Sequence, residues 1–270
     1  MMITVIRINK VLNKNTSSRY YMKYLLAGLL FLISSIARAT ELDATLAWSQ
    51  KVELSTPVNG VVQQVFAQTG KIAAKGEVLV QVDPRGFNAQ LKSARAKLKS
   101  AEQTYAEAKR ELEREQDMYD RTMLSEHDLQ IAKNNHVAAL AKLQQAKSEL
   151  THAQLNVEYS AIRAPFNAII IETRAVKGQV VSSAISPPVL VVVAEAHRML
   201  ARTYINADKV DSVVINQGAS VKVGARTFQG KISNIGMETD NKKPAQYMVD
   251  VIFDSGNELL RAGQAAKVEI

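Results

Sequence analysis

The chain has 270 residues, of which 47% are apolar, 6% aromatic and 22% charged. This composition is typical of globular proteins and excludes wholesale disorder, a collagen-like fibre and a polytopic membrane protein. The formal net charge is +8, but six of the 34 Lys and Arg lie in residues 1–39, which contain no Asp or Glu. Because the remaining 28 basic residues face 26 acidic ones, the excess charge belongs mainly to a leader, and a nucleic-acid partner is not expected.

Residues 1–39 have the pattern of a secretory signal peptide. A basic flank precedes the apolar run 24–33, and small residues stand at the −3 and −1 positions of a cleavage after Ala39. Translation starts at Met1 or at Met22. The apolar run is shorter than the roughly 20 residues that span a bilayer, so an uncleaved N-terminal anchor is only the alternative interpretation. Cysteine is absent, which excludes disulfides and lipidation of an N-terminal Cys.

Residues 40–85 and 160–195 contain two copies of one β-motif. Six positions align without a gap at an offset of 108 residues: Asn59, Gly60, Val61, Val62, Gly70 and Ile72 match Asn167, Ala168, Ile169, Ile170, Gly178 and Val180. Each copy ends in a Val-rich run typical of a strand, and Gly70 and Gly76 are expected at positive φ. Because neither half can bury both faces of its sheet, the two halves are predicted to pack together as a small flattened barrel.

Residues 86–159, which separate the two copies, are predicted to form an antiparallel coiled-coil hairpin. They contain no Pro, and their apolar or small residues recur in steps of three and four. The first seam is Leu91, Ala94, Leu98, Ala101, Tyr105, Ala108, Leu112, Glu115 and Tyr119; the second is Leu129, Ala132, His136, Ala139, Leu143, Ala146, Leu150, Ala153 and Val157. Ser125 is expected to cap the second helix, with Asp128 in its first turn. About 33 residues per arm give a rod of roughly 50 Å, which buries little area and gains from lateral partners.

Residues 196–270 alternate polar and apolar side chains in several short runs separated by glycines. This rhythm predicts a small antiparallel β-barrel, with one short helix at 208–214. The fold class is therefore α+β and elongated: a coiled-coil hairpin inserted in a split β-domain, followed by a β-barrel.

No catalytic, cofactor or metal site is expected. The four His, at 127, 136, 152 and 197, lack metal-ligand spacing, and residues 69–72 lack the flanking residues of a phosphate loop. His136 lies on the seam, where a register-setting role is expected. A swinging-arm carrier would need a modified Lys between its two halves, a position that the hairpin occupies. The protein is therefore not expected to be an enzyme.

The parts of the chain that follow residue 39 resemble a known family in order and spacing. The motifs are Pro57-Val58-Asn59-Gly60-Val61-Val62 followed by Gly70, Gly76 and Asp83, then the hairpin, then Ile162-Arg163-Ala164-Pro165-Phe166 leading to Gly178-Gln179-Val180-Val181. They resemble the periplasmic adaptor proteins, or membrane fusion proteins, of tripartite efflux and secretion systems. The chain is most similar to adaptors of resistance-nodulation-division exporters and more distantly similar to haemolysin secretion adaptors.

The resemblance implies a fold, a function and partners. The two β-halves would form a biotinyl/lipoyl-like domain, and the chain would link an inner-membrane transporter, favoured to be of the resistance-nodulation-division type, to an outer-membrane channel protein. Copies would associate into a ring, as a trimer of dimers or a hexamer, in the periplasm. The alternatives from other classes are a biotinyl/lipoyl carrier-like subunit and a periplasmic coiled-coil scaffold without a pump.

The resemblance also implies a docking site at the hairpin tip. Adaptors of this type contact the outer-membrane duct through Arg, three residues, Leu, six residues and Ser. Here Arg114, Met118 and Ser125 match this spacing, with Met in place of Leu. The alternative is that Arg114 is a solvated helix charge among neighbouring Glu residues and that Ser125 is only a cap.

Two departures from the family pattern affect these expectations. Ala168 stands where the family prefers Gly, which would cost about 1 kcal/mol if the turn required positive φ. The sequence ends at Ile270, where a barrel strand should end. It is therefore expected to be a short form without a membrane-proximal domain, which would grip its transporter through the barrel alone or through a longer companion adaptor.

Overall fold

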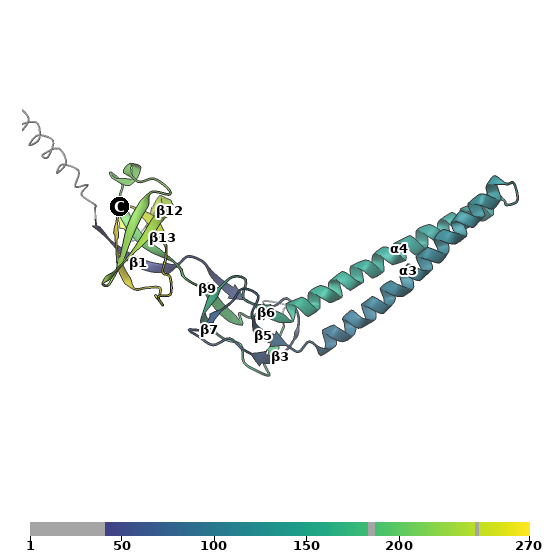
Figure 1. Ribbon diagram of the computed structural model, residues 1–270, viewed down its shortest axis with the longest axis horizontal. Helices are drawn as coiled ribbons and strands as arrows, with labels where there is room; N and C mark the ends of the chain where they lie inside the picture. Colours follow the sequence, from purple (N-terminus) through teal and green to yellow (C-terminus); the bar gives the residue numbers. More distant parts are fainter. Residues whose placement is uncertain (1–40, 183–186, 241–242) are drawn as a thin grey trace, which may run out of the picture. The chain divides into compact units, whose positions relative to one another are not determined.

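The computed structural model describes residues 41–182, 187–240 and 243–270 (Figure 1). The expected signal peptide lies outside the described residues. Within the described ranges, no helix combines the length and the apolar character that crossing a membrane requires. The chain divides into two compact units, one of which comprises Thr45–Arg202 and Ile252–Gln264. The second unit holds the rest of the described chain.

Six strands form a closed barrel in the order β1-β10-β13-β12-β11-β14. Their bounds are β1 Glu41–Trp48, β10 Arg198–Asn206, β11 Gly218–Val223, β12 Arg226–Asp240, β13 Lys243–Asp254 and β14 Ala265–Glu269. Strand β11 pairs antiparallel with β12 and with β14, where Val221 lies opposite Val268. Alternate side chains such as Val221, Ile232, Val249 and Val268 are fully buried, so the period-two pattern produced the predicted barrel.

Two details of the barrel differ from the sequence analysis. Strand β1, which was grouped with residues 40–85, lies beside β10 in the barrel. Its pairing partner is about 150 residues away in the chain, so no local pattern could assign it. The short helix expected at 208–214 is one turn of 3₁₀ helix, η1 Val210–Ser212.

The repeated β-motif forms two four-stranded sheets, ordered β2-β9-β7-β4 and β6-β5-β3-β8. Their bounds are β2 Lys51–Leu54, β3 Gly60–Val65, β4 Ile72–Ala73, β5 Val78–Val82, β6 Ala161–Arg163, β7 Ala168–Thr173, β8 Val180–Val181 and β9 Val191–Glu195. Each sheet takes strands from both copies. The prediction that the two halves pack on one another is therefore confirmed.

The pairing between the copies follows the offset of the repeat. Gly60 lies opposite Val181, and Ala73 lies opposite Ala168. The backbone N–H of Val62 donates to Gln179 O over 2.8 Å, and the N–H of Ile170 donates to Lys71 O over 2.9 Å. Adding 108 to Val62 gives Ile170, and subtracting 108 from Gln179 gives Lys71, so the second hydrogen bond is the first with its two strands exchanged. The repeat is thus a pseudo-twofold relation in which each copy completes the sheet of the other.

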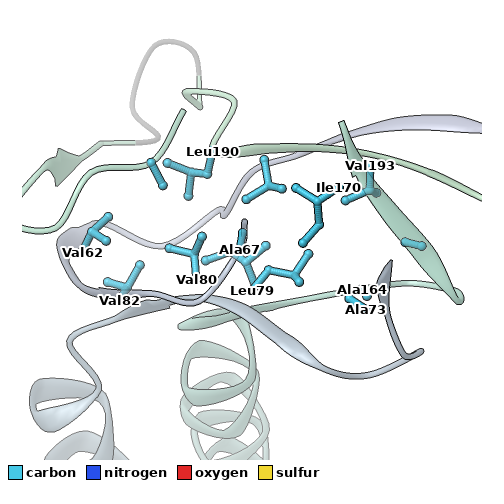
Figure 2. Packing of buried hydrophobic residues seen from close by; sticks show 14 of the residues in the cluster. Val62, Ala67, Ala73, Leu79, Val80, Val82, Ala164, Ile170, Leu190 and Val193 are labelled. Carbon is cyan, nitrogen blue, oxygen red and sulfur yellow. The ribbon is translucent and has the colours of Figure 1, made fainter. Parts of the chain in front are cut away.

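One hydrophobic core lies between the two sheets (Figure 2). It contains Val62, Leu79 and Val80 from the first copy and Ile170 and Leu190 from the second. Neither copy could enclose these side chains alone, because each supplies only part of the two sheets.

The glycine expectations are confirmed in part. Gly70 and Gly76 both have φ of +84°, as predicted. The concern about Ala168 was wrong, because Ala168 has no positive φ and lies buried in strand β7. Its counterpart Gly60 is instead required by packing, since a Cβ there would lie 2.5 Å from Val82 Cγ1.

Between the two halves of the sheets, helices α3 Arg85–Asp120 and α4 Glu126–Tyr159 form an antiparallel hairpin (Figure 1). Residues of the predicted second seam are buried: Leu129, Ala132, Ala139, Leu143, Ala146 and Ala153. The rings of Tyr105 and His136, both predicted seam residues, have centroids 5.2 Å apart. Lys97 Nζ also reaches Glu149 Oε2 across the two helices at 3.1 Å. The coiled-coil prediction is therefore confirmed for the hairpin and for most of the second seam, whereas Ala94 is the buried residue of the first seam and Tyr119 is exposed.

Candidate functional site

The distal end of α3 closes in a Schellman motif. The N–H of Met123 donates to Met118 O over 2.9 Å, and the N–H of Thr122 donates to Tyr119 O over 2.8 Å. Thr122 occupies the left-handed position of this motif, with φ of +59°, where Gly is the usual residue. The helix end is thus satisfied by its own backbone, and the chain reverses within a few residues.

Ser125 caps the beginning of α4, as the sequence predicted. Its Oγ accepts a hydrogen bond from the N–H of Asp128 over 3.2 Å and donates to Asp128 Oδ2 over 2.6 Å. Glu126 and Asp128 place negative charge in the first turn, where the helix dipole favours it. The turn between the helices is therefore held by caps on both sides.

The three predicted docking residues lie at this end of the hairpin. Arg114 and Met118 are one turn apart on the same flank of α3, and Ser125 begins α4. The guanidinium of Arg114 is solvent-exposed and hydrogen-bonded to the carboxylate of Glu111, with Glu115 Oε1 at 3.6 Å. Met118 is half-buried and Ser125 is exposed.

Two apolar side chains at the tip are exposed. Met123, which the sequence analysis missed, lies in the turn with 62% of its surface exposed, and Tyr119, which it placed at the end of the first seam, is 37% exposed. Tight turns are normally polar, so the apolar pair Met123-Leu124 was the signal that could have identified Met123. Charged residues surround them, including the ion pair of Arg121 with Asp117 at 2.9 Å.

This arrangement has the chemistry of a contact surface. Exposed apolar side chains ringed by charged ones are typical of protein interaction sites. Within the residues that the structure describes, no group of three or more His, Cys, Asp or Glu is placed to hold a metal ion. His127, the histidine adjacent to the turn, is exposed.

The fold and the tip together define a known class of protein, the membrane fusion or adaptor proteins, in which a hairpin interrupts a sandwich of two small sheets. The family described as "CzcB-like, barrel-sandwich hybrid domain" matches residues 50–195, and the chain belongs to this family. The matched residues contain both β-halves and the whole hairpin.

Curated relatives include transport proteins. The chain is 25% identical over 240 residues to the macrolide export protein MacA of Yersinia pestis, an alignment that covers 82% of this chain and 64% of MacA. It is 28% identical over 146 residues to the multidrug resistance protein MdtA of Proteus mirabilis, covering 52% of this chain and 34% of MdtA. The chain thus spans less than two thirds of the length of these relatives.

Solved structures with the same fold include a MacA–MexA chimeric protein that contains the Pseudomonas aeruginosa MexA α-hairpin. It has a TM-score of 0.64 and 21% identity, covering 87% of this chain and 81% of that chain. The membrane fusion protein Spr0693 of Streptococcus pneumoniae R6 has a TM-score of 0.63 and 14% identity, covering 86% and 98%. At these identities the likeness concerns the fold alone.

Proposed function

We propose that this protein is a periplasmic adaptor subunit of a tripartite transport system. It links an inner-membrane exporter, of the resistance-nodulation-division type, to an outer-membrane duct and seals the conduit between them. Family membership supports this proposal, together with one observation: the distal turn of the hairpin is capped on both sides and exposes apolar side chains. The transporter supplies the energy, and the adaptor transmits conformation and prevents leakage.

Docking of the duct at Arg114, Met118 and Ser125 is consistent with the energetics of the tip. An exposed ion pair such as Arg114 with Glu111 contributes at most about 1 kcal/mol, so a carboxylate of the duct can replace Glu111 at small cost. Met118 and Met123 are flexible apolar side chains that adapt to the shape of a partner. The duct is therefore expected to contact both α3 and the turn.

Charge reversal at Arg114 tests this docking site. Arg114→Glu is expected to abolish capture of the outer-membrane channel after crosslinking in cells, while the helical circular dichroism stays unchanged. Arg95→Glu is the matched control, because Arg95 is an exposed arginine of the same helix about 28 Å from Arg114. Undiminished capture by Arg114→Glu would count against the site.

Two substitutions separate the docking role of Ser125 from its capping role. Asn is as good an N-cap as Ser, whereas Ala removes the cap and costs about 1 kcal/mol. Ser125→Ala is expected to lose both stability and capture, and Ser125→Asn is expected to lose capture alone. If Ser125→Asn captures the channel as the unsubstituted protein does, Ser125 is only a cap.

A photo-reactive amino acid at Met123 distinguishes an adaptor from a scaffold without a pump. In the adaptor, irradiation of cells is expected to join this position to an outer-membrane channel protein that mass spectrometry identifies. The same amino acid at Lys99, far from the tip on α3, is expected to yield no such product. Absence of a channel from the products at Met123 contradicts the adaptor function.

Lateral association into a ring is the second part of the proposal. Helix α4 exposes Val137 and Leu140, which lie one turn apart on one face and outside the seam with α3, and it exposes Ile131 on another flank. Val137→Glu is expected to lower the oligomeric mass measured by light scattering, because it places a charge on this apolar surface. Lys142→Glu puts the same side chain on the opposite flank of α4 and is expected to leave the mass unchanged. An equal mass for all three proteins would remove the support for packing through this helix.

A further inference from the structure

At strands β4 and β7 the face of the sheet that is turned away from the core carries isoleucines, although such a face is normally polar, as it is at Lys51 and Glu53 of β2. Ala73 and Ala168 are paired neighbours on the core side, and the next pair along, Ile72 opposite Ile169, points the other way. Ile72 is 52% exposed. The core requires only one face of these strands, so the apolar residues of the second face are unexplained by folding alone.

A groove of about 280 Å³ lies along this face. Its apolar lining consists of Ile169 and Ile171 of β7 together with Trp48, Leu259 and Leu260. All the lining residues belong to the same compact unit of the chain. The volume is close to the lower end of the range for small-molecule sites, roughly 300–1,000 Å³.

The segment that carries Leu259 and Leu260 is held in place by backbone hydrogen bonds. The N–H of Gly263 donates to Leu46 O over 2.8 Å, and the N–H of Leu46 donates to Gln264 O over 2.9 Å. The N–H of Arg261 donates to the side chain of Gln264 over 2.9 Å. These bonds hold the segment against β1, and Leu259 keeps 51% of its surface exposed.

The lining of the groove includes a cationic side chain. It belongs to Arg261, and the guanidinium of Arg261 has no ion-pair or hydrogen-bond partner in the described parts of the chain. Thr69 lines the groove as well. A second cavity of about 40 Å³ shares Trp48, Ile169, Leu259 and Leu260 with the groove and is also lined by Glu258, whose negative charge disfavours an anion there.

We propose that this groove binds a single-chain anionic amphiphile, such as a medium-chain carboxylate. The apolar tail lies against Trp48, Ile169 and Leu259, and the carboxylate accepts charge-assisted hydrogen bonds from Arg261. The absence of an acceptor for the Arg261 guanidinium among the described residues favours an anionic headgroup over a neutral one. This inference is independent of the adaptor function, because the groove shares no residue with the hairpin tip.

Trp48 is the only tryptophan of the chain, so its fluorescence reports directly on the groove. Titration of the full chain with decanoate, below its micelle concentration, is expected to shift the Trp48 emission to shorter wavelength with saturation. Affinity is expected to rise about fourfold per added methylene between octanoate and decanoate. Decanol, of the same length but uncharged, is expected to bind about tenfold more weakly.

Substitution of Arg261 tests whether its guanidinium binds the carboxylate headgroup. Arg261→Gln is expected to weaken decanoate binding about tenfold and to leave decanol binding unchanged, whereas Arg95→Gln, a solvated arginine of the hairpin, is expected to change neither. Equal affinity of decanoate for Arg261→Gln and the unsubstituted protein overturns the proposal, and so does an emission that decanoate does not change.

Vesicles of phosphatidylglycerol identify the source of the amphiphile. Co-sedimentation with vesicles, without any response to monomeric decanoate, overturns the proposal in favour of a membrane surface. A response to decanoate without co-sedimentation supports it. Decanoate binding does not depend on whether the photo-reactive amino acid at Met123 captures a channel protein. Either proposal can therefore fail while the other holds.

Discussion

Gly60 lies in strand β3 at a position where the repeat has Ala168 in its second copy. The structure assigns Gly60 a packing role, because a Cβ there would lie 2.5 Å from Val82 Cγ1 in the core. Gly60→Ala is therefore expected to lower the free energy of unfolding by about 1–3 kcal/mol, measured by urea denaturation. Gly86→Ala is the control, since a Cβ at Gly86 meets nothing within 4 Å.

Gly86 lies in the first turn of α3, where Ala is the better helix former, so the control is expected to be neutral or slightly stabilising. Unfolding of Gly60→Ala at the same urea concentration as the unsubstituted protein would show that β3 moves away from Val82 without cost.

Asp83 gives the fold a dependence on pH just before α3. The guanidinium of Arg85 and its backbone N–H donate to the carboxylate of Asp83, which lowers the pKa of this group from 3.8 to about 2. A carboxyl whose pKa is lowered on folding stabilises the folded state above its unfolded pKa and loses this contribution as pH falls. The contribution is thus complete above about pH 4 and disappears toward pH 2.

Asp83→Asn is expected to be less stable than the unsubstituted protein at pH 5, with the difference shrinking as pH falls from 4 to 2. Urea denaturation at several pH values measures this difference. A difference that is the same at pH 5 and pH 2 contradicts the role of the Asp83 carboxylate.

At the scale of elements, the apolar residues of the hairpin differ in burial: those on the seam lie between the helices, and those outside it are exposed. Leu143 faces α3 and is 6% exposed, whereas Leu140, one turn earlier in α4, is 36% exposed. Leu143→Ala is expected to lower the free energy of unfolding by about 2–3 kcal/mol, because it leaves a cavity between the helices. Leu140→Ala is expected to cost less than about 1 kcal/mol. Thermal unfolding followed by circular dichroism compares the two, and equal losses would mean that the seam is placed wrongly.

At the scale of the whole molecule, the two β-halves are held together by each other and not by the hairpin. Strand β3 pairs with β8 and β4 pairs with β7, across the entire insertion. A protease site inserted between Met123 and Leu124 tests this arrangement. After cleavage, the two fragments are expected to elute together in gel filtration and to separate only in denaturing urea. Separate elution in native buffer would show that the connection through the hairpin maintains the fold.

The hairpin was predictable from the sequence because its signals are local. The spacing of Leu129, Ala132 and Leu143 places these side chains on one helical face, and Ser125 with Asp128 marks the beginning of a helix within four residues. The docking residues Arg114, Met118 and Ser125 were found by resemblance to a motif with fixed spacing. Met123 was missed because a single apolar residue in a turn has no periodicity.

By itself, the sequence determined the elements: an apolar leader pattern, two copies of a β-motif, a heptad hairpin between them and a set of alternating strands. These follow from side-chain periodicity, which acts over a few residues. Only the tertiary structure decided that β1 joins the barrel, that the copies exchange strands, that Gly60 must accommodate Val82 and that Arg261 lies beside an apolar groove. Such contacts join residues that are between about 20 and 200 positions apart, and they depend on how complete elements pack, which no local pattern encodes.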